Sequence, residues 1–268
     1  MFSKAKNGKI EIGNTDMDYV SFGKGDRCLL MIPGVSDGMK TVKGMAIAFA
    51  VMYKRFAKCY RVYVISRKNN LENGYSTREM AADYKTALEK LGISHVDVIG
   101  ISQGGMIAQY IAIDYPDLVG KLVLAVTLSR QNEIVRSVGS SWIKMAESND
   151  FRGILVDSIE KSYTEKRQKK YKHLYPLLSR IGKQKDLKRF IIQANACISH
   201  DAYGELCRIK CSTLVIGAGN DKVVGIDASK EIADNVDNSI LKIYEGFGHG
   251  LQEEAKEFNK QILEFLSS

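Results

Sequence analysis

The stretch HVDVIGISQGGMIAQYIA, residues 95–112, joins two hydrophobic patterns at a serine that lies between glycines. Val96–Ile101 is an apolar run of strand length, and apolar residues at helical spacing follow the serine. Gly100, Ser102 and Gly104 match the pattern G-x-S-x-G, which is informative between a strand and a helix. We predict a sharp turn with a positive φ at Ser102, which lifts its hydroxyl above the carboxyl ends of the strands.

Strand and helix patterns alternate through most of the 268 residues. Apolar strands between amphipathic helices are typical of an α/β protein with a mainly parallel sheet covered on both faces. Two early strand patterns indicate an antiparallel start to that sheet. The predicted strands are Lys9–Ile12, Met17–Phe22, Arg27–Ile32, Arg61–Ser66, Val96–Ile101, Lys121–Leu128, Ser212–Gly217 and Ile240–Tyr244, with helices at Met39–Lys58, Thr77–Leu91, Gln103–Tyr115, Ala228–Val236 and Glu253–Phe265.

Between the sixth and seventh predicted strands the sequence has only helical patterns, at Gln131–Ser148, Arg152–Lys169, Tyr171–Ile181 and Asp186–Cys197. We therefore predict a core formed by residues 1–129 and 206–268, with a helical cap inserted over residues 130–205. Residues 130–210 hold 17 Lys and Arg against 9 Asp and Glu, which accounts for the net charge of +8 of the whole chain. This basic segment is either a solvated helical face or a surface that attracts an anionic substrate, partner or membrane.

A serine hydroxyl needs a neighbouring base to act as a nucleophile, and the chain has four histidines. His249, in GFGHG, follows the last predicted strand, so we expect it at the same edge of the sheet as Ser102. His95 opens the strand that leads to Ser102 and belongs at the opposite edge. His173 and His200 lie in or beside the helical insertion. The pattern therefore favours His249 as the base.

The base in turn needs an acid that orients its ring and stabilises the imidazolium. Asp221, in VIGAGNDKVV, comes just after the predicted strand Ser212–Gly217, again at the carboxyl edge. Asp227 is the competing acid, but its position favours a cap at the start of the next helix. The order Ser102, Asp221, His249 is the nucleophile–acid–histidine order that accompanies a serine on a strand-to-helix turn.

Acyl transfer also needs donors for a developing oxyanion. The backbone N–H of Gln103, directly after the serine, is one candidate. The second is the N–H of Val35, in MIPGVSDG, because Gly34 lets the backbone bend inward before it. Apolar residues that suit either the pocket wall or the core are Met106, Leu128, Trp142 and Phe247.

With these residues, the sequence resembles the α/β-hydrolase fold superfamily over nearly its whole length. The match is carried by Gly100–Gly105, Asp221, His249 and the pair Pro33-Gly34. The stretch VIGISQGGMIAQYIAIDYPDLVGKLVLA is similar to small cap-bearing esterases, enol-lactonases and carbon–carbon bond hydrolases. The resemblance implies an eight-stranded, mainly parallel sheet with helices on both faces and a helical lid after the sixth strand. It implies no cofactor and no metal.

The sequence departs from the family at two places that shape the pocket. Pro33-Gly34 stands where many relatives have His-Gly, which removes a side chain but keeps the backbone donors. The stretch SRKNNLENGYS retains only Arg67, Gly74 and Ser76 of a D-x-R-G-x-G-x-S-like segment. These departures affect the expected pocket shape and leave the three candidate catalytic residues in place.

The leading hypothesis is a serine hydrolase that forms an acyl-enzyme on carboxylic esters of small or medium size. A carbon–carbon bond hydrolase or a lactonase would use the same three residues. A slow-turnover ligand-binding sensor would retain them as well. The expected partner is a small ester-like molecule, and an anionic one only if the basic insertion attracts the substrate and is not a solvated face. The sequence does not indicate an oligomeric state.

Other classes of protein are disfavoured by the composition. No apolar run reaches the roughly 20 residues that a membrane span needs. The first 13 residues, MFSKAKNGKIEIG, contain no apolar signal core, so we predict a cytoplasmic protein. The five cysteines are scattered, and Cys207 and Cys211 have no second pair nearby, which favours reduced thiols over a zinc site. No motif for nucleic-acid binding occurs.

Overall fold

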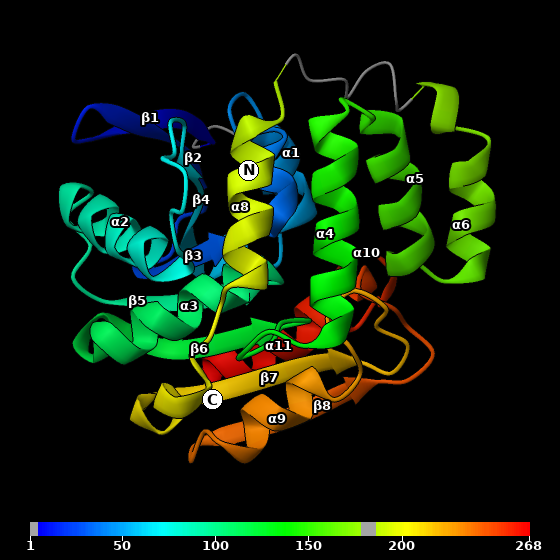
Figure 1. Cartoon of the computed structure of the whole chain (residues 1–268). Helices are drawn as coiled ribbons and strands as arrows, with labels where there is room; N and C mark the ends of the chain where they lie inside the picture. The colour runs from blue at the N-terminus through cyan, green and yellow to red at the C-terminus, as the bar shows by residue number, and fades with distance from the viewer. Residues whose placement is uncertain (1–4, 178–185) are drawn as a thin grey trace.

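One sheet in the order β1-β2-β4-β3-β5-β6-β7-β8 organises the chain, as the computed structural model of residues 5–177 and 186–268 describes it (Figure 1). β2 is antiparallel to β1 and β4, and all other neighbours are parallel. The predicted mainly parallel, eight-stranded sheet is therefore confirmed. The strands are β1 Lys6–Ile12, β2 Thr15–Phe22, β3 Arg27–Ile32, β4 Tyr60–Lys68, β5 Val96–Ile101, β6 Val119–Ala125, β7 Ser212–Ala218 and β8 Ser239–Tyr244.

Helices cover both faces of the sheet, as the sequence predicts. α2 (Thr77–Lys90), α3 (Gln103–Asp114) and α9 (Ala228–Asp234) share one buried apolar cluster with the strands. α1 (Ala46–Met52) and α11 (Phe258–Ser267) share a second cluster with the opposite face. The sheet is thus the middle layer of three, which explains why the central strands are apolar on both sides.

In the described part of the segment between β6 and β7 the longer helices are α4 Glu133–Glu147, α5 Phe151–Ser162, α6 Glu165–Lys172 and α8 Lys188–Ile198. In Figure 1 α4, α5 and α6 stand side by side. α4, α5 and α8 form a third apolar cluster with Met39 and Met106 of the sheet-bearing part. The predicted Tyr171–Ile181 helix extends beyond the described residues. The division into a core and a cap at residues 130 and 205 stays a prediction.

The predicted helix Met39–Lys58 is wrong at both ends. Val35–Gly38 forms a short 3-10 helix, and α1 covers only Ala46–Met52. Gly44 has a φ of +80°, and the backbone N–H of Val42 donates to the Ser66 hydroxyl instead of to a helical carbonyl. A left-handed residue and a bond to the neighbouring strand both interrupt the helix.

One predicted strand is shorter than the pattern suggests, and two predicted helices are each divided in two. β6 stops at Ala125 because Val126 has a φ of +45°, outside the strand region. The predicted helix Arg152–Lys169 divides at Tyr163, which is extended, and Thr164 caps the next helix. The last predicted helix, Glu253–Phe265, is two helices, α10 (Leu251–Glu254) and α11, separated by an extended Ala255.

None of the helices in the described ranges has both the length and the apolar character that a membrane crossing requires.

Candidate active site

The turn between β5 and α3 has the strained geometry that the glycines predict. Ser102 has a φ of +55° and a ψ of −121°, outside the favoured regions for a residue with a side chain. A β-carbon on Gly100 would lie 2.4 Å from the Gly104 carbonyl oxygen, and one on Gly104 would lie 2.0 Å from the Ile32 carbonyl oxygen. Any larger residue would push the turn off β3, so the serine is held at the carboxyl edge by close backbone packing.

The three side chains that the sequence singles out lie in hydrogen-bond contact. His249 Nε2 is 2.9 Å from Ser102 Oγ, and His249 Nδ1 is 2.8 Å from Asp221 Oδ2. A carboxylate only accepts, so Nδ1 carries the proton and Nε2 accepts from the serine hydroxyl. The side chain of His249 is 12% exposed and that of Asp221 is 2% exposed. The imidazole therefore faces a cavity on one side and a buried acid on the other.

The loops after β7 and β8 position the acid and the imidazole. The other carboxylate oxygen of Asp221 accepts from the backbone N–H groups of Val223 and Val224 at 2.8 and 3.0 Å. The N–H of Asn220 donates to the Phe247 carbonyl at 2.9 Å, which links the two loops directly. Because parallel strands end at one edge of the sheet, residues 102, 221 and 249 meet there.

The two candidate oxyanion donors lie at helix starts beside the serine. Gln103 is the first residue of α3 and Val35 is the first residue of the 3-10 helix η1 (Val35–Gly38), so neither N–H has an acceptor within its own helix. A β-carbon on Gly34 would lie 3.4 Å from Ser102 Cβ and 3.9 Å from its Oγ. The strand-ending turn of β3 therefore passes directly over the serine.

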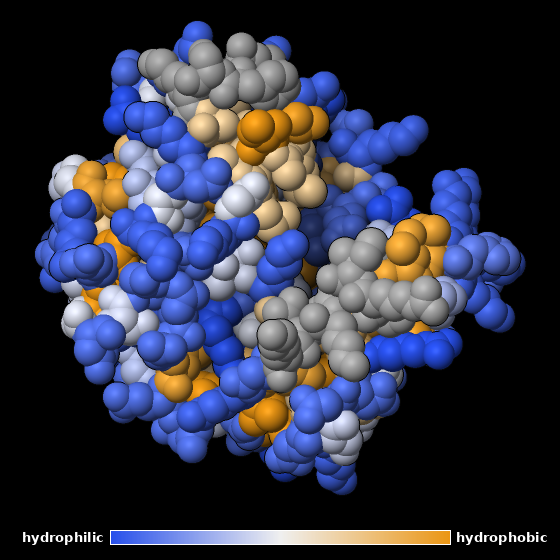
Figure 2. All heavy atoms as spheres, turned by 90° about the horizontal axis from the view of Figure 1, so that it is seen from above, coloured by the Kyte–Doolittle hydropathy of each residue, from blue (hydrophilic) through white to orange (hydrophobic). Residues whose placement is uncertain are grey.

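A cavity of about 430 Å³ opens on the Ser102 and His249 side chains. Seen from above, the surface of the molecule is recessed beside apolar side chains (Figure 2). The wall opposite the serine comes from α4 and α5, and its apolar members are Trp142, Phe151, Ile154, Leu155 and Ile159. Among the described residues that line the cavity, none is a lysine or an arginine, and Glu253 is the carboxylate.

Polar groups are few on the cavity wall. Burial, followed by the nearby Glu253 carboxylate, raises the pKa of Tyr163, so this hydroxyl is a neutral polar group of the wall. Gln252 also lines the cavity, and its Oε1 is buried without a hydrogen-bond partner among the described residues. The arrangement suits a largely apolar, uncharged ligand.

Of the four apolar residues considered as pocket walls, Trp142 lines the cavity and donates its Nε1–H to Asp157 at 2.6 Å. Met106 and Leu128 lie instead in the apolar cluster beneath α4 and α8. Phe247 packs against the face of the sheet that α11 covers. Sequence spacing alone did not separate wall residues from core residues, and it identified none of the α5 residues of the wall.

The alternative acid and the other histidines with described contacts lie elsewhere. Asp227 precedes α9 as predicted, but its side chain makes no capping hydrogen bond. His95 contacts the Asp117 carbonyl at 3.3 Å, away from the cavity. His200 is buried against Thr77, and burial lowers its pKa to about 3. Within the described residues, no three His, Cys, Asp or Glu side chains cluster as metal ligands would, and the five cysteines are free thiols.

Comparison with known proteins gives a consistent fold. A family model of the alpha/beta hydrolase fold matches residues 57–256. A 2-hydroxy-6-oxononadienedioate/2-hydroxy-6-oxononatrienedioate hydrolase of Pseudomonas putida is 24% identical over 99% of this chain and 95% of its own. The alpha/beta hydrolase MGS-M2, from a deep-sea metagenome library, superposes with a TM-score of 0.87 at 21% identity, over 97% of this chain and 98% of that one. The enol-lactonase of Burkholderia xenovorans LB400 gives a TM-score of 0.83 at 17% identity, over 97% and 100%.

Proposed function

This chain belongs to the alpha/beta hydrolase fold family, and we propose that it is a serine hydrolase that works through an acyl-enzyme. The observation that carries the proposal is the unbroken hydrogen-bond chain from Asp221 through His249 to Ser102, which ends in an apolar cavity. Nucleophile, base and orienting acid are the three groups that acyl transfer by serine requires.

In the proposed mechanism, Ser102 Oγ attacks the substrate carbonyl carbon while His249 Nε2 takes the hydroxyl proton. Asp221 holds the imidazole in the Nδ1–H form and stabilises the imidazolium that forms. The N–H groups of Gln103 and Val35 donate to the oxyanion of the tetrahedral intermediate. His249 then protonates the leaving group. A water molecule attacks the acyl-enzyme by the same route and releases the acid.

We propose a carboxylic ester with a small or medium, largely apolar acyl group as the substrate. The cavity of about 430 Å³ lies within the usual range for small-molecule sites, and its wall is mainly aliphatic and aromatic. An additional carboxylate on the substrate would find no lysine or arginine among the described lining residues. The expectation of an anionic substrate therefore rests on the basic insertion alone.

The second candidate is hydrolysis of a carbon–carbon bond or a lactone. The names of the Pseudomonas putida relative and of the Burkholderia xenovorans enol-lactonase favour it. Both reactions would use the same three side chains. The dioate in the first relative's name carries two carboxylates. The described residues that line the cavity include no lysine or arginine to pair with them. A ligand-binding sensor with slow turnover is the third reading, and it predicts ligand-dependent stabilisation without multiple turnovers.

The decisive experiment measures hydrolysis of p-nitrophenyl esters of increasing chain length, with a vinylogous diketone and a lactone in parallel. Ester turnover that disappears in Ser102→Ala supports the serine esterase. The preferred chain length then shows how long an acyl group the cavity accepts. If the diketone or the lactone is turned over faster than the esters, that compound class becomes the proposed substrate in place of the ester. Activity that survives in Ser102→Ala would refute the site assignment.

A further inference from the structure

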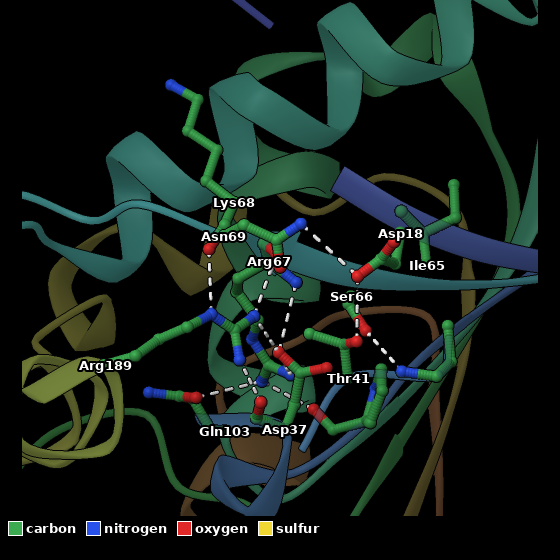
Figure 3. A network of polar contacts seen from close by, with 12 residues as sticks. Asp18, Asp37, Thr41, Ile65, Ser66, Arg67, Lys68, Asn69, Gln103 and Arg189 are labelled. Carbon is green, nitrogen blue, oxygen red and sulfur yellow. Dashed lines mark hydrogen bonds and ion pairs between the residues drawn. The ribbon is translucent and has the colours of Figure 1, made fainter. Parts of the chain in front are cut away.

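A buried polar cluster lies directly behind the candidate oxyanion turn (Figure 3). Its centre is Arg67, at the carboxyl end of β4, whose side chain is 1% exposed. The guanidinium donates to the carbonyl oxygens of Pro33 at 2.5 Å and Gly34 at 3.2 Å, and to Gln103 Oε1 at 2.9 Å. One side chain therefore contacts the turn that carries Val35 and the residue that follows the serine.

Asp37 and Arg189 extend this cluster to helix α8. Asp37 Oδ2 accepts from the backbone N–H of Arg67 at 3.2 Å and lies 2.6 Å from an amino group of Arg189. Arg189 also donates to the carbonyl oxygens of Asp37, Arg67 and Lys68. Its guanidinium is therefore saturated by the core and does not line the cavity. On the same helix, the Gln193 carbonyl accepts from Gln103 Nε2 at 2.6 Å.

Such a cluster is a weak means of stabilising a fold. Burying charges costs solvation that an apolar replacement would not lose. Two atoms of the cluster, Arg67 Nε and Asp37 Oδ1, have no hydrogen-bond partner among the described residues, which adds to that cost. A buried network with unpaired atoms calls for a role other than stability.

The position of the Arg67 contacts indicates that role. Gly34 C=O and Val35 N–H belong to the same peptide group, so a cation on the oxygen polarises the N–H that is the candidate oxyanion donor. Asp37 N–H donates to the same oxygen at 3.1 Å, which fixes the peptide plane from a second side. Among the ion-paired groups Asp37, Arg67 and Arg189, two guanidinium groups face one carboxylate, so these three side chains carry a net positive charge behind the turn.

We propose that Arg67 is a positioning residue for the oxyanion hole: it orients and polarises the Gly34–Val35 peptide and holds Gln103, while Asp37 and Arg189 tie this clamp to α8. The inference rests on the proposed serine hydrolase function, because it assigns a role in the same tetrahedral intermediate. Arg67 does not touch the substrate, so it acts on the rate of the chemical step and not on substrate binding.

The test compares Arg67→Met and Arg67→Lys with the wild type in steady-state kinetics on the preferred p-nitrophenyl ester. We expect kcat to fall about 10- to 100-fold in Arg67→Met, less than the roughly 10²- to 10³-fold that follows loss of a complete oxyanion donor. KM should change by less than about threefold. Affinity for phenylboronic acid, whose serine adduct is tetrahedral and anionic, should fall by about the same factor as kcat.

A matched control separates the proposed role of Arg67 from the general effect of removing an arginine that pairs with carboxylates. Arg78 also bridges two carboxylates, Asp114 and Glu205, but lies on α2 away from the cavity. Arg78→Met should lower thermal stability and leave kcat and the boronate affinity unchanged. If Arg67→Met does not fold, Arg67→Lys and Arg189→Met carry the test, with kcat losses of about 3- to 10-fold expected from a loosened peptide plane.

Two results would overturn the proposal. The first is an unchanged kcat and an unchanged boronate affinity in a folded Arg67→Met. If Arg67→Met does not fold, the same result in both Arg67→Lys and Arg189→Met has this meaning. The second is a rise in KM at constant kcat, which would make Arg67 a substrate-binding residue. Ser102→Ala distinguishes these failures from failure of the proposed function: activity lost in Ser102→Ala but intact in the Arg67 variants refutes the clamp alone.

Discussion

Two imidazoles in this molecule contact a hydroxyl at the same distance. His249 Nε2 is 2.9 Å from Ser102 Oγ, and His200 Nδ1 is 2.9 Å from Thr77 Oγ1. The surroundings of the two rings differ. Asp221 holds the far nitrogen of His249, whereas Nε2 of His200 is buried without a partner among the described residues. His249 opens on the cavity, and His200 packs edge-on against Tyr110.

The difference shows that a histidine–hydroxyl contact does not by itself make a catalytic device. The His249 pair has a carboxylate on the far ring nitrogen, an adjoining cavity and two N–H groups at helix starts beside the serine, which are the features that the proposed chemistry requires. The His200 pair has none of these and satisfies a buried ring at the start of α2. The first pair is therefore the one to which we assign chemistry, and the second is expected to matter for stability.

The largest expected difference follows from removing each hydroxyl. Ser102→Ala should lower kcat by about 10⁴- to 10⁶-fold, because no other group supplies the nucleophile. Thr77→Val should leave kcat within about threefold but cost about 1–3 kcal/mol of unfolding free energy, since a buried ring nitrogen loses its partner. Ester kinetics and urea unfolding of both variants check this. A large kcat loss in Thr77→Val would break the distinction between the two pairs.

The next largest expected difference in kcat lies between replacing Asp221 and replacing Asp227. Asp221→Asn should keep an acceptor for the Val223 and Val224 N–H groups yet lower kcat by about 10⁴-fold, because an amide favours the wrong tautomer of His249. Asp227→Asn is the matched control, six residues on at the start of α9, and should keep kcat within about twofold. Measured kcat values that fall equally in both variants would mean that the loop, and not the carboxylate of Asp221, is the sensitive element.

The sequence predicted those parts of the site that depend on local pattern and on sheet geometry. The glycines around Ser102 indicate a strained turn without reference to any distant residue. Asp221 and His249 were found because each follows an apolar strand, and parallel strands end at one edge. The contact of all three side chains is a consequence of topology, which the alternating hydrophobic pattern reveals.

The parts that the sequence did not predict depend on contacts between distant segments. Asp37 and Arg67 are 30 residues apart, and Asp37 and Arg189 are 152 residues apart, so no local pattern pairs them. The helix expected over Met39–Lys58 failed for the same reason, since Val42 is bound to Ser66 of a neighbouring strand. Apolar spacing on α5 identifies a helix but not whether its residues face a core or a cavity.

The buried state of His200 predicts a pH dependence of stability. Burial lowers its pKa to about 3 in the folded chain, against a usual value near 6.5. Below about pH 6.5 the unfolded chain takes up a proton that the folded chain does not, so stability falls as pH decreases toward about 3 and is unaffected by this group at higher pH. This group should lower the free energy of unfolding by about 2 kcal/mol when the pH falls from 7.5 to 5.0.

Replacing His200 isolates that contribution from other titrating groups. His200→Gln keeps a side chain that can form a hydrogen bond with Thr77. Between pH 7.5 and pH 5.0 its free energy of unfolding, measured with urea, should fall by about 2 kcal/mol less than that of the wild type. Its kcat should remain within about twofold, because the ring is remote from the cavity lining. Equal pH slopes in the two proteins would show that His200 is protonated in the folded state.

The smallest expected effect concerns how a substrate approaches the cavity beside His249. α6 carries the exposed Lys166, Lys169, Lys170 and Lys172, and Tyr171 of the same helix lines the cavity that contains His249. Charges at this surface act over about one Debye length, roughly 10 Å at 0.1 M salt, so they can steer an anionic ester toward the entrance. Raising salt from about 0.05 to 0.3 M should lower kcat/KM for an anionic ester a few-fold and leave a neutral ester unchanged.

Charge removal on α6 tests whether that helix is the source of the effect. The double substitution Lys169→Gln and Lys170→Gln should abolish the salt dependence for the anionic ester, since it removes two exposed charges and touches no lining residue. Lys85→Gln, on α2, is the control and should keep the dependence. If the anionic ester shows no salt dependence in the wild type, the basic helix is a solvated face. In that case specificity resides entirely in the largely apolar cavity, because steering at the entrance would add nothing to the contacts made beside His249.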